Sequence, residues 1–200
     1  MKKIGITGGV GSGKSAILNY IKEKYGAYIC VADELAKRLE QPGGVCYEGL
    51  RKAFGDGILA EDGQIDNKAF AALIFSDEEA RKKANAIIHP AVRTAIEKEI
   101  KEQEAAGCAL YVLEAALLIE EGYDEILDEL WYVYAPEDVR FQRLEESRGY
   151  SREKSLSIMR RQKSDIEFRK HCQRIIDNGG EPWESEAQID AILSGEGFRC

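Results

Sequence analysis

The stretch Gly8-Gly9-Val10-Gly11-Ser12-Gly13-Lys14-Ser15 decides how this chain folds. It fits the pattern G-x-x-x-x-G-K-[ST], a loop that binds phosphate groups. Residues 3–7 before it suit a short buried strand, and residues 16–24 after it carry apolar side chains at helical spacing. This strand–loop–helix context predicts a phosphate-binding loop, not a glycine-rich turn that merely caps a helix.

The residue types in this loop match the needs of a bound anion. Glycines let the backbone turn and approach a phosphate closely, and the loop amides and helix N-terminus face its oxygens. Lys14 places a positive charge on the β- and γ-phosphates, and Ser15 offers a hydroxyl to Mg²⁺. We expect the nucleotide to be bound by the whole loop and the residue after it: Gly8, Gly9, Val10, Gly11, Ser12, Gly13, Lys14, Ser15 and Ala16.

Length, charge and cysteine content limit the remaining possibilities. The 200 residues suit one α/β domain with an insertion, and a net charge of -8 does not suit non-specific nucleic-acid binding. The five cysteines are an odd number without a C-x-x-C pair, so we expect reduced thiols in a cytoplasmic protein and no metal site made from them. No apolar targeting region is evident, and we expect neither secretion nor membrane insertion.

A second apolar run, residues 27–31, predicts another strand, and Asp33 follows it. Ligands of open α/β sheets lie beyond the carboxyl ends of the strands, so Asp33 is well placed to face the phosphate loop. The alternative is that Asp33 caps a helix over residues 34–39. Position alone leaves both interpretations open.

The next segment, residues 41–106, predicts a helical insertion. Helical patterns cover residues 47–54 and 68–75. By analogy with kinases that contain such a phosphate loop, an insertion of this kind would supply the acceptor pocket. His89-Pro90 is expected to end one helix and to start another over residues 91–105, because a residue before proline disfavours helical geometry. By composition alone, His89 is a helix-end residue.

Two further apolar runs, residues 109–113 and 129–134, predict buried parallel strands. Glu114 ends the first of these strands. An acid at the end of a buried strand beside a phosphate loop is where enzymes with this loop hold Mg²⁺, directly or through water. The alternative is that Glu114 is a surface glutamate. A short helix is expected to start at residues 117–119. Residues 174–178 predict a fifth strand, so the fold is an α/β protein with a parallel five-stranded sheet flanked by helices.

Arginines accumulate after the fourth strand. Helix 137–146 and a second helix after Gly149-Tyr150-Ser151 suggest a lid over residues 137–171 that closes over a triphosphate, with Arg140 and Arg143 acting on its charge. The alternative is a solvated pair of charged helices.

After the fifth strand, Asn178 lies in a polar turn that would frame an adenine base, and residues 182–193 predict a closing helix.

Ordered motifs along nearly the whole chain resemble the dephospho-CoA kinase family. They comprise residues 5–15, Ala32-Asp33, Pro42-Gly43, Phe54-Gly55, Asp62-Gly63, His89-Pro90, residues 117–120, Arg143-Leu144, Arg148, Gln162 and Ile176-Asp177-Asn178. This resemblance implies a P-loop kinase that uses ATP and Mg²⁺ to phosphorylate the 3′-hydroxyl of dephospho-CoA. It implies a core of about residues 1–40, 107–135 and 172–200, with the insertion and the lid between these segments.

Carried over by position, the resemblance also implies residue roles. Asp33 would be the base or would orient the acceptor hydroxyl, and Lys14, Arg140 and Arg143 would act on the phosphates. The acceptor-binding residues would be Asp33, His89, Leu117, Leu118 and Glu120, and the metal-binding residues Ser15 and Glu114. We expect a monomer with ATP and dephospho-CoA as its partners.

The chain departs from the family pattern at three places. Val31 replaces the first acid of Asp-Ala-Asp, Glu114 and Ala116 replace an aspartate and a proline, and Cys172-Gln173 replaces Ala-Asp.

Two other classes of protein stay open: a P-loop kinase of another small acceptor, and a GTP-binding switch. The switch requires Asn-Lys-x-Asp, and residues 67–70 lack its aspartate.

Overall fold

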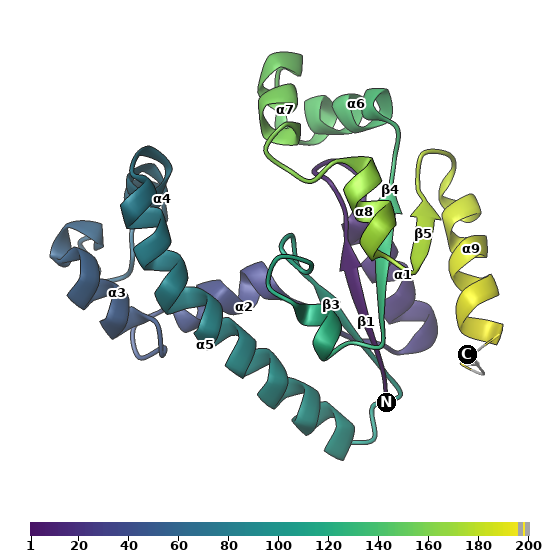
Figure 1. Ribbon diagram of the computed structural model, residues 1–200, viewed down its shortest axis with the longest axis horizontal. Coiled ribbons are helices and arrows are strands. Elements are labelled where there is room, and N and C mark those ends of the chain that lie inside the picture. The colour runs from purple at the N-terminus through teal and green to yellow at the C-terminus, as the bar shows by residue number, and fades with distance from the viewer. Residues whose placement is uncertain (196–197, 199–200) are drawn as a thin grey trace. The chain divides into compact units, whose positions relative to one another are not determined.

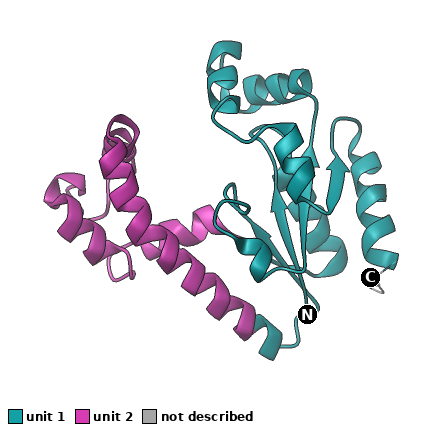
Figure 2. Cartoon of the chain, viewed as in Figure 1, with its two compact units in different colours: residues 1–30, 103–200 teal, residues 31–102 magenta. Residues whose placement is uncertain are grey.

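The computed structural model describes residues 1–195 and 198. The chain divides into two compact units (Figure 2). Unit 1 comprises residues Met1–Cys30 and Gln103–Cys200, and unit 2 comprises Val31–Glu102. Unit 2 therefore begins ten residues before the insertion expected from the sequence, since the helix after the second strand belongs to it.

Unit 1 is built on a five-stranded sheet in the order β2-β3-β1-β4-β5 (Figure 1). Its strands are β1 (Lys2–Thr7), β2 (Tyr28–Val31), β3 (Leu110–Glu114), β4 (Glu129–Tyr134) and β5 (Arg174–Asp177). The pairs β1–β3, β1–β4 and β4–β5 are parallel. The predicted fold class is confirmed, and the central strand β1 leads directly into the phosphate loop.

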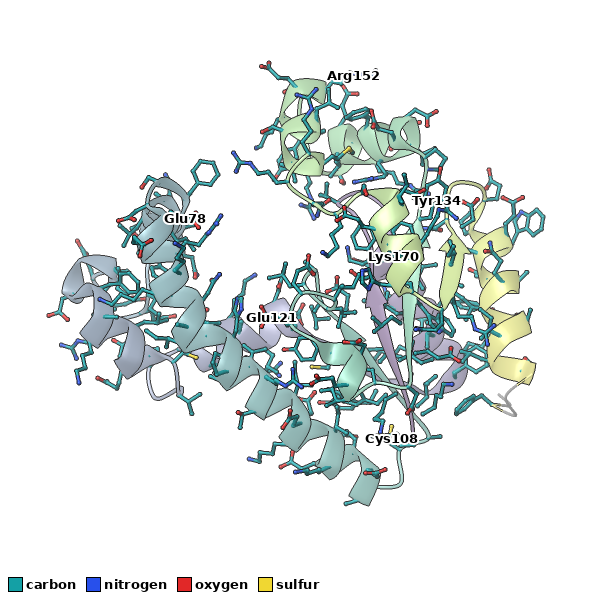
Figure 3. The ribbon with its side chains drawn as sticks, viewed as in Figure 1. Glu78, Cys108, Glu121, Tyr134, Arg152 and Lys170 are labelled. Carbon is teal, nitrogen blue, oxygen red and sulfur yellow. The ribbon has the colours of Figure 1, made fainter. Side chains whose placement is uncertain are left out.

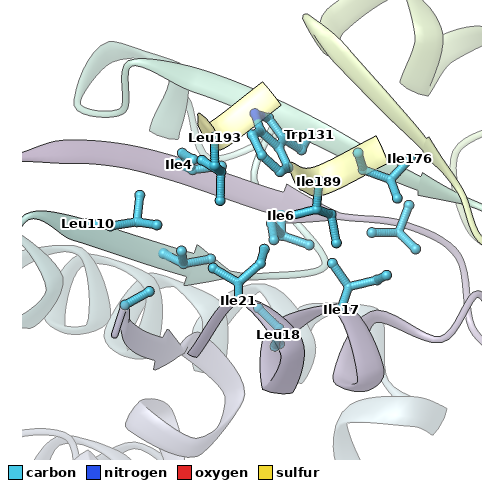
Figure 4. Packing of buried hydrophobic residues seen from close by; sticks show 13 residues of the cluster. Ile4, Ile6, Ile17, Leu18, Ile21, Leu110, Trp131, Ile176, Ile189 and Leu193 are labelled. Carbon is cyan, nitrogen blue, oxygen red and sulfur yellow. The ribbon is translucent and has the colours of Figure 1, made fainter. Parts of the chain in front are cut away.

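Apolar side chains cover both faces of this sheet. On one face, α1 (Lys14–Tyr25) and α9 (Pro182–Gly195) bury Ile17, Ile21 and Ile189 against Ile4, Ile6, Leu110, Trp131 and Ile176 of the strands (Figure 4). On the other face, Phe168 of α8 (Asp165–His171) stacks on Tyr132, with ring centroids 4.7 Å apart. A parallel sheet needs such double cover, which explains its nearly continuous apolar strands.

The predicted short helix at residues 117–119 is wrong. Residues 116–122 form turns, and 3-10 helix η2 (Tyr123–Glu125) follows. The backbone hydrogen bonds there reach back four residues from Glu121 to Leu117, five from Tyr123 to Leu118 and three from Gly122 to Ile119. Because these spacings change at each step, no regular helical ladder forms.

Two helices follow β4, as predicted. They are α6 (Glu137–Arg148) and α7 (Arg152–Met159), and the Ser151 side chain caps α7 by accepting a hydrogen bond from the Lys154 amide. The Arg152 guanidinium on α7, labelled in Figure 3, lies 4.7 Å from the Phe141 ring centroid and packs the two helices together. The next helix, α8, was not predicted.

Unit 2 is helical and has its own core. It contains α2 (Ala32–Leu39), α3 (Tyr47–Phe54), 3-10 helix η1 (Asp56–Ile58), α4 (Asn67–Ser76) and most of α5 (Glu78–Ala105). Its buried cluster comprises Cys46, Tyr47, Leu50, Ile58, Ile65, Phe70 and Ala84. These helices confirm the helical patterns that the sequence predicts for residues 47–54 and 68–75.

The predicted helix break at His89-Pro90 is wrong, because α5 runs through Pro90 without interruption. Proline removes one backbone donor and crowds the preceding turn, but buried side chains fix the helix on both sides of it. Ala84 lies on one side of Pro90, and Val92 and Ile96 lie on the other. Tertiary packing therefore overrides the local preference at this position.

The described cysteines Cys30, Cys46, Cys108 and Cys172 carry free thiols. Burial raises the pKa of the Cys172 thiol to about 11. Cys200, the fifth cysteine of the sequence, lies outside the described residues. Across residues 1–195, none of the helices is both long enough and apolar enough to cross a membrane.

Candidate active site

The phosphate loop connects β1 to α1 and adopts a conformation that only glycine allows at several positions. Gly11 and Gly13 have φ values of 79° and 88°. A side chain at Gly8 would collide with the Val133 carbonyl. No described residue accepts a hydrogen bond from the amides of Gly13, Lys14 or Ser15, so these donors at the start of α1 are available to an anion.

The Lys14 ammonium lies over this loop. Its Nζ donates to the Gly8 carbonyl at 2.9 Å and lies 3.6 Å from Oε1 of Glu114. The parallel register explains the second contact, because Glu114 on β3 pairs with Ile6 on β1, just before the loop. The structure thus brings together Lys14 and Glu114, two residues that the sequence analysis assigned to phosphate and metal.

Both predicted lid arginines contact the main chain of the loop. On α6, Arg140 Nε donates to the Val10 carbonyl at 2.8 Å, and Arg143 Nη1 donates to the Ser12 carbonyl at 3.3 Å. Burial lowers the pKa of the Arg140 guanidinium. These side chains belong to one face of the helix and lie against the loop, so α6 is not simply a solvated charged helix.

Asn178 approaches the loop from the end of β5. It is buried, and its side-chain amide donates to the Ser12 carbonyl at 2.8 Å. The adjoining turn borders a pocket of about 280 Å³ lined by Pro136, Asp177, Gly179, Gly180, Glu184 and Gln188. Asn178 therefore holds the Ser12 carbonyl of the loop, and the turn that follows it borders this pocket.

Two residues that received no role from the sequence also belong to this region. Gln162 Oε1 accepts a hydrogen bond from the Val10 amide at 2.8 Å, and Lys163 Nζ lies 3.3 Å from Oε1 of Glu120. Gln162 was among the family motifs, but it follows the helical hairpin in an irregular segment. Its sequence position alone did not indicate a contact with a loop so distant in sequence.

The predicted acceptor residues of unit 1 have different environments. Leu118 is fully buried and lies beside Gly5, so its side chain is part of the core and offers no exposed surface to a ligand. Leu117 is exposed, and Glu120 is exposed and paired with Lys163. Of these three residues, only Leu117 and Glu120 present side chains to solvent.

The two predicted site residues of unit 2 lie on helices. Asp33 is exposed in the first turn of α2; Val31 occupies the N-cap position, and no side-chain cap is formed. The alternative that Asp33 caps the helix is therefore wrong, because the helix begins one residue before it. His89 is half-buried within α5, which corrects its interpretation as a helix-end residue.

The oxygen donors near the loop fit Mg²⁺. Ser15 presents an exposed hydroxyl in the first turn of α1, Glu114 supplies a carboxylate, and the buried Thr7 hydroxyl has no hydrogen-bond partner. Mg²⁺ prefers such hard oxygen ligands and usually keeps several waters beside one or two protein groups. The described residues form no group of three or more His, Cys, Asp or Glu side chains suited to a metal ion.

A parallel sheet, a phosphate loop at the end of its central strand and arginines that reach this loop from a following helix define the class of P-loop kinases. The family model described as dephospho-CoA kinase matches residues 2–184. The chain belongs to the dephospho-CoA kinase family.

Individual relatives agree with this assignment. The chain is 40% identical over 192 residues to the protein named dephospho-CoA kinase from Geobacter sulfurreducens, and the match covers 96% of this chain and 97% of the relative. The crystal structure of TT1252 from Thermus thermophilus is 32% identical, with a TM-score of 0.82 and 97% of both chains covered. Dephospho-CoA kinase from Campylobacter jejuni, 23% identical, shares the fold with a TM-score of 0.72 and covers 98% of this chain and 100% of its own.

Proposed function

We propose that this protein transfers the γ-phosphate of ATP to the 3′-hydroxyl of dephospho-CoA, giving CoA and ADP. The observation that carries the proposal is the phosphate loop with Lys14, Glu114 and two arginines against it, in a chain that belongs to this family. A kinase of another small acceptor has the same loop but is not favoured by family membership over residues 2–184. A GTP-binding switch lacks support because its guanine-reading motif is absent from the sequence.

In this mechanism, unit 1 binds and polarises the triphosphate. The free amides of the loop and the Lys14 ammonium hold the β- and γ-phosphates, while Arg140 and Arg143 extend the positive charge toward the transferred group. Adenine would lie near Asn178, beside the turn that borders the pocket. Phosphoryl transfer demands little covalent chemistry, so positioning and charge stabilisation supply most of the rate.

Ser15 and Glu114 would hold Mg²⁺, with Glu114 acting directly or through water. When bound, the ion neutralises charge that develops on the phosphate oxygens. Glu114 also keeps the Lys14 ammonium over the loop through their contact at 3.6 Å. The Glu114 carboxylate would thus contact both positive groups of the phosphate site, the Lys14 ammonium and Mg²⁺.

On the acceptor side of the reaction, Asp33 would act on the ribose hydroxyl. Its carboxylate would accept the proton of the ribose hydroxyl or hold that oxygen in line with the γ-phosphate. The exposed side chain, which is not used as a helix cap, supports this role. His89, Leu117 and Glu120 would contact other parts of dephospho-CoA, within a helical insertion that binds the acceptor; we further propose a cytoplasmic monomer.

A coupled assay of ADP release tests the proposed function. Purified protein with ATP and Mg²⁺ is offered dephospho-CoA, shikimate, gluconate and a set of nucleosides at equal concentrations. We expect ADP release with dephospho-CoA alone, and phosphorus NMR of the product should place the new phosphate on the 3′ oxygen. Faster turnover with any other acceptor would reject the assignment.

A further inference from the structure

Val10, in the middle of the phosphate loop, is held by two side chains at once. Its carbonyl accepts from Arg140 Nε and its amide donates to Gln162 Oε1, both at 2.8 Å. Arg140 lies in the first half of α6, and Gln162 follows the end of α7. The two ends of the helical hairpin therefore meet at one residue of the loop.

The segment that presents Gln162 is itself fixed to the sheet. Lys163 pairs with Glu120 at 3.3 Å, and the Ser164 side chain and Glu167 form a capping box that starts α8. Within α8, Phe168 stacks on Tyr132 of β4. Burial and the nearby Asp165 carboxylate raise the pKa of the Tyr132 hydroxyl, so this residue stays neutral in the stack. Gln162 is thus placed by neighbours with defined positions, as a precise contact requires.

The hydrogen bond also fixes how the Gln162 side chain is oriented. The backbone amide of Val10 can only donate, so the carboxamide must turn its oxygen toward the loop. This bond uses an amide that has no other acceptor among the described residues. Without it, the middle of the loop would lose one of the two contacts that hold Val10 in place.

We propose that Gln162 is a positioning residue for phosphoryl transfer: it fixes the Val10 peptide, and with it the phosphate loop, against the base of the helical hairpin. This inference rests on the proposed kinase function. A small displacement of a loop that orients the γ-phosphate costs rate more than it costs binding, because in-line geometry is needed only in the transition state.

The chain offers a matched control in Gln173. Its Oε1 also accepts a hydrogen bond from a backbone amide, that of Leu130, at 2.7 Å. Leu130 lies at the start of β4, whereas the loop lies at the carboxyl ends of the parallel strands. Gln162→Met and Gln173→Met therefore remove the same kind of bond at the two opposite ends of the sheet.

The test compares these two variants with the wild type, using turnover, the KM for dephospho-CoA, ADP affinity and melting temperature. For Gln162→Met we expect kcat to fall roughly 10- to 100-fold, with KM and ADP affinity within about twofold. Amide hydrogen exchange at Val10 should become faster. For Gln173→Met we expect a lower melting temperature with kcat and loop exchange unchanged.

A kcat for Gln162→Met within about twofold of the wild type would overturn the proposal, on the scale that a positioning role predicts. So would unchanged exchange at Val10, or a loss of kcat that Gln173→Met reproduces. If Gln162→Met does not fold, Gln162→Asn, which withdraws the amide by one methylene, is held to the same criteria. A wild-type protein without dephospho-CoA turnover would reject the proposed function itself, while the exchange data would still report on the Gln162–Val10 bond.

Discussion

The phosphate side and the acceptor side of the proposed reaction are built differently. In unit 1, side chains from separate elements form hydrogen bonds to the main chain of one short loop: Lys14, Arg140, Arg143, Gln162 and Asn178. In unit 2, Asp33 and His89 lie on two helices of a unit with a separate core. In the proposed reaction, phosphate binding is therefore organised within unit 1, whereas acceptor activation would use residues of unit 2.

This difference predicts two kinds of loss upon substitution. Loss of a group that is proposed to contact the phosphates, such as Lys14, should weaken nucleotide binding together with turnover. Changes at the acceptor side should lower turnover or acceptor affinity and leave the nucleotide site intact.

The largest expected effect is on the acceptor side. Asp33→Asn keeps the size and a hydrogen-bond acceptor but removes the charge and basicity, so turnover should fall roughly 10²–10⁴-fold. Steady-state kinetics with saturating ATP measures this loss. Glu34→Gln, which changes the neighbouring exposed acid in the same helical turn, is the matched control and should keep wild-type turnover. Equal rates for Asp33→Asn and the wild type would remove Asp33 from the mechanism.

Lys14→Ala should produce the next largest loss. In the proposed mechanism the ammonium stabilises charge on the phosphates in the ground and transition states, so turnover should fall roughly 10²–10³-fold and ATP binding should weaken. Kinetics and calorimetric titration with ATP measure both effects. Lys22→Ala, an exposed position on the same helix, serves as the control. A folded Lys14→Ala protein with near wild-type turnover would exclude the phosphate-loop assignment.

Replacing one arginine of α6 should lower turnover less than replacing Lys14, because Arg140 and Arg143 both contact the loop and one of them remains. We expect Arg140→Ala or Arg143→Ala to lower turnover by ~10², and to lower it more than they weaken ATP binding. Arg174→Ala, which removes an arginine paired with Glu129 at the opposite end of the sheet, is the control. Full activity in both single variants would show that the arginine acting on the transferred phosphate lies elsewhere in the lid.

The smallest expected effect concerns stability in unit 2. Asp66 caps α4 by accepting hydrogen bonds from the amides of Lys68 and Ala69. Asp66→Ala should lower the free energy of unfolding by about 1 kcal/mol. Chemical denaturation measures the change, while kcat and ADP affinity should stay at wild-type values. A loss of ADP affinity would contradict the proposal that nucleotide binding depends on unit 1 and not on unit 2.

The phosphate loop and most of the sheet could be predicted because strong local rules govern them. A phosphate loop needs glycines and lysine at fixed spacing, and buried parallel strands need continuous apolar runs. α8 also had a local signal that the sequence analysis overlooked, since Ser164 and Glu167 have the capping-box spacing. Local rules failed at Pro90, where packing on both sides of the proline maintains the helix.

The contacts of Gln162 and Asn178 with the loop could not be predicted from spacing. Each joins residues more than a hundred positions apart, through connections whose geometry depends on the folded sheet. The burial of Leu118 depends in the same way on packing beside Gly5, where a side chain would crowd Leu130, Leu127 and Leu118. Such features follow from tertiary packing and not from local sequence.

The most direct test of the division between the two sides is the affinity of ADP for Asp33→Asn and Lys14→Ala, measured side by side by calorimetry with Mg²⁺ present. The affinity of Asp33→Asn should stay within about twofold of the wild type, because this change leaves the loop and its contacts intact. Lys14→Ala should bind ADP at least ~10-fold more weakly, since it removes the charge that we propose to contact the phosphates. Equal losses in the two variants would contradict the account, because nucleotide binding would then depend on unit 2 as much as on the loop.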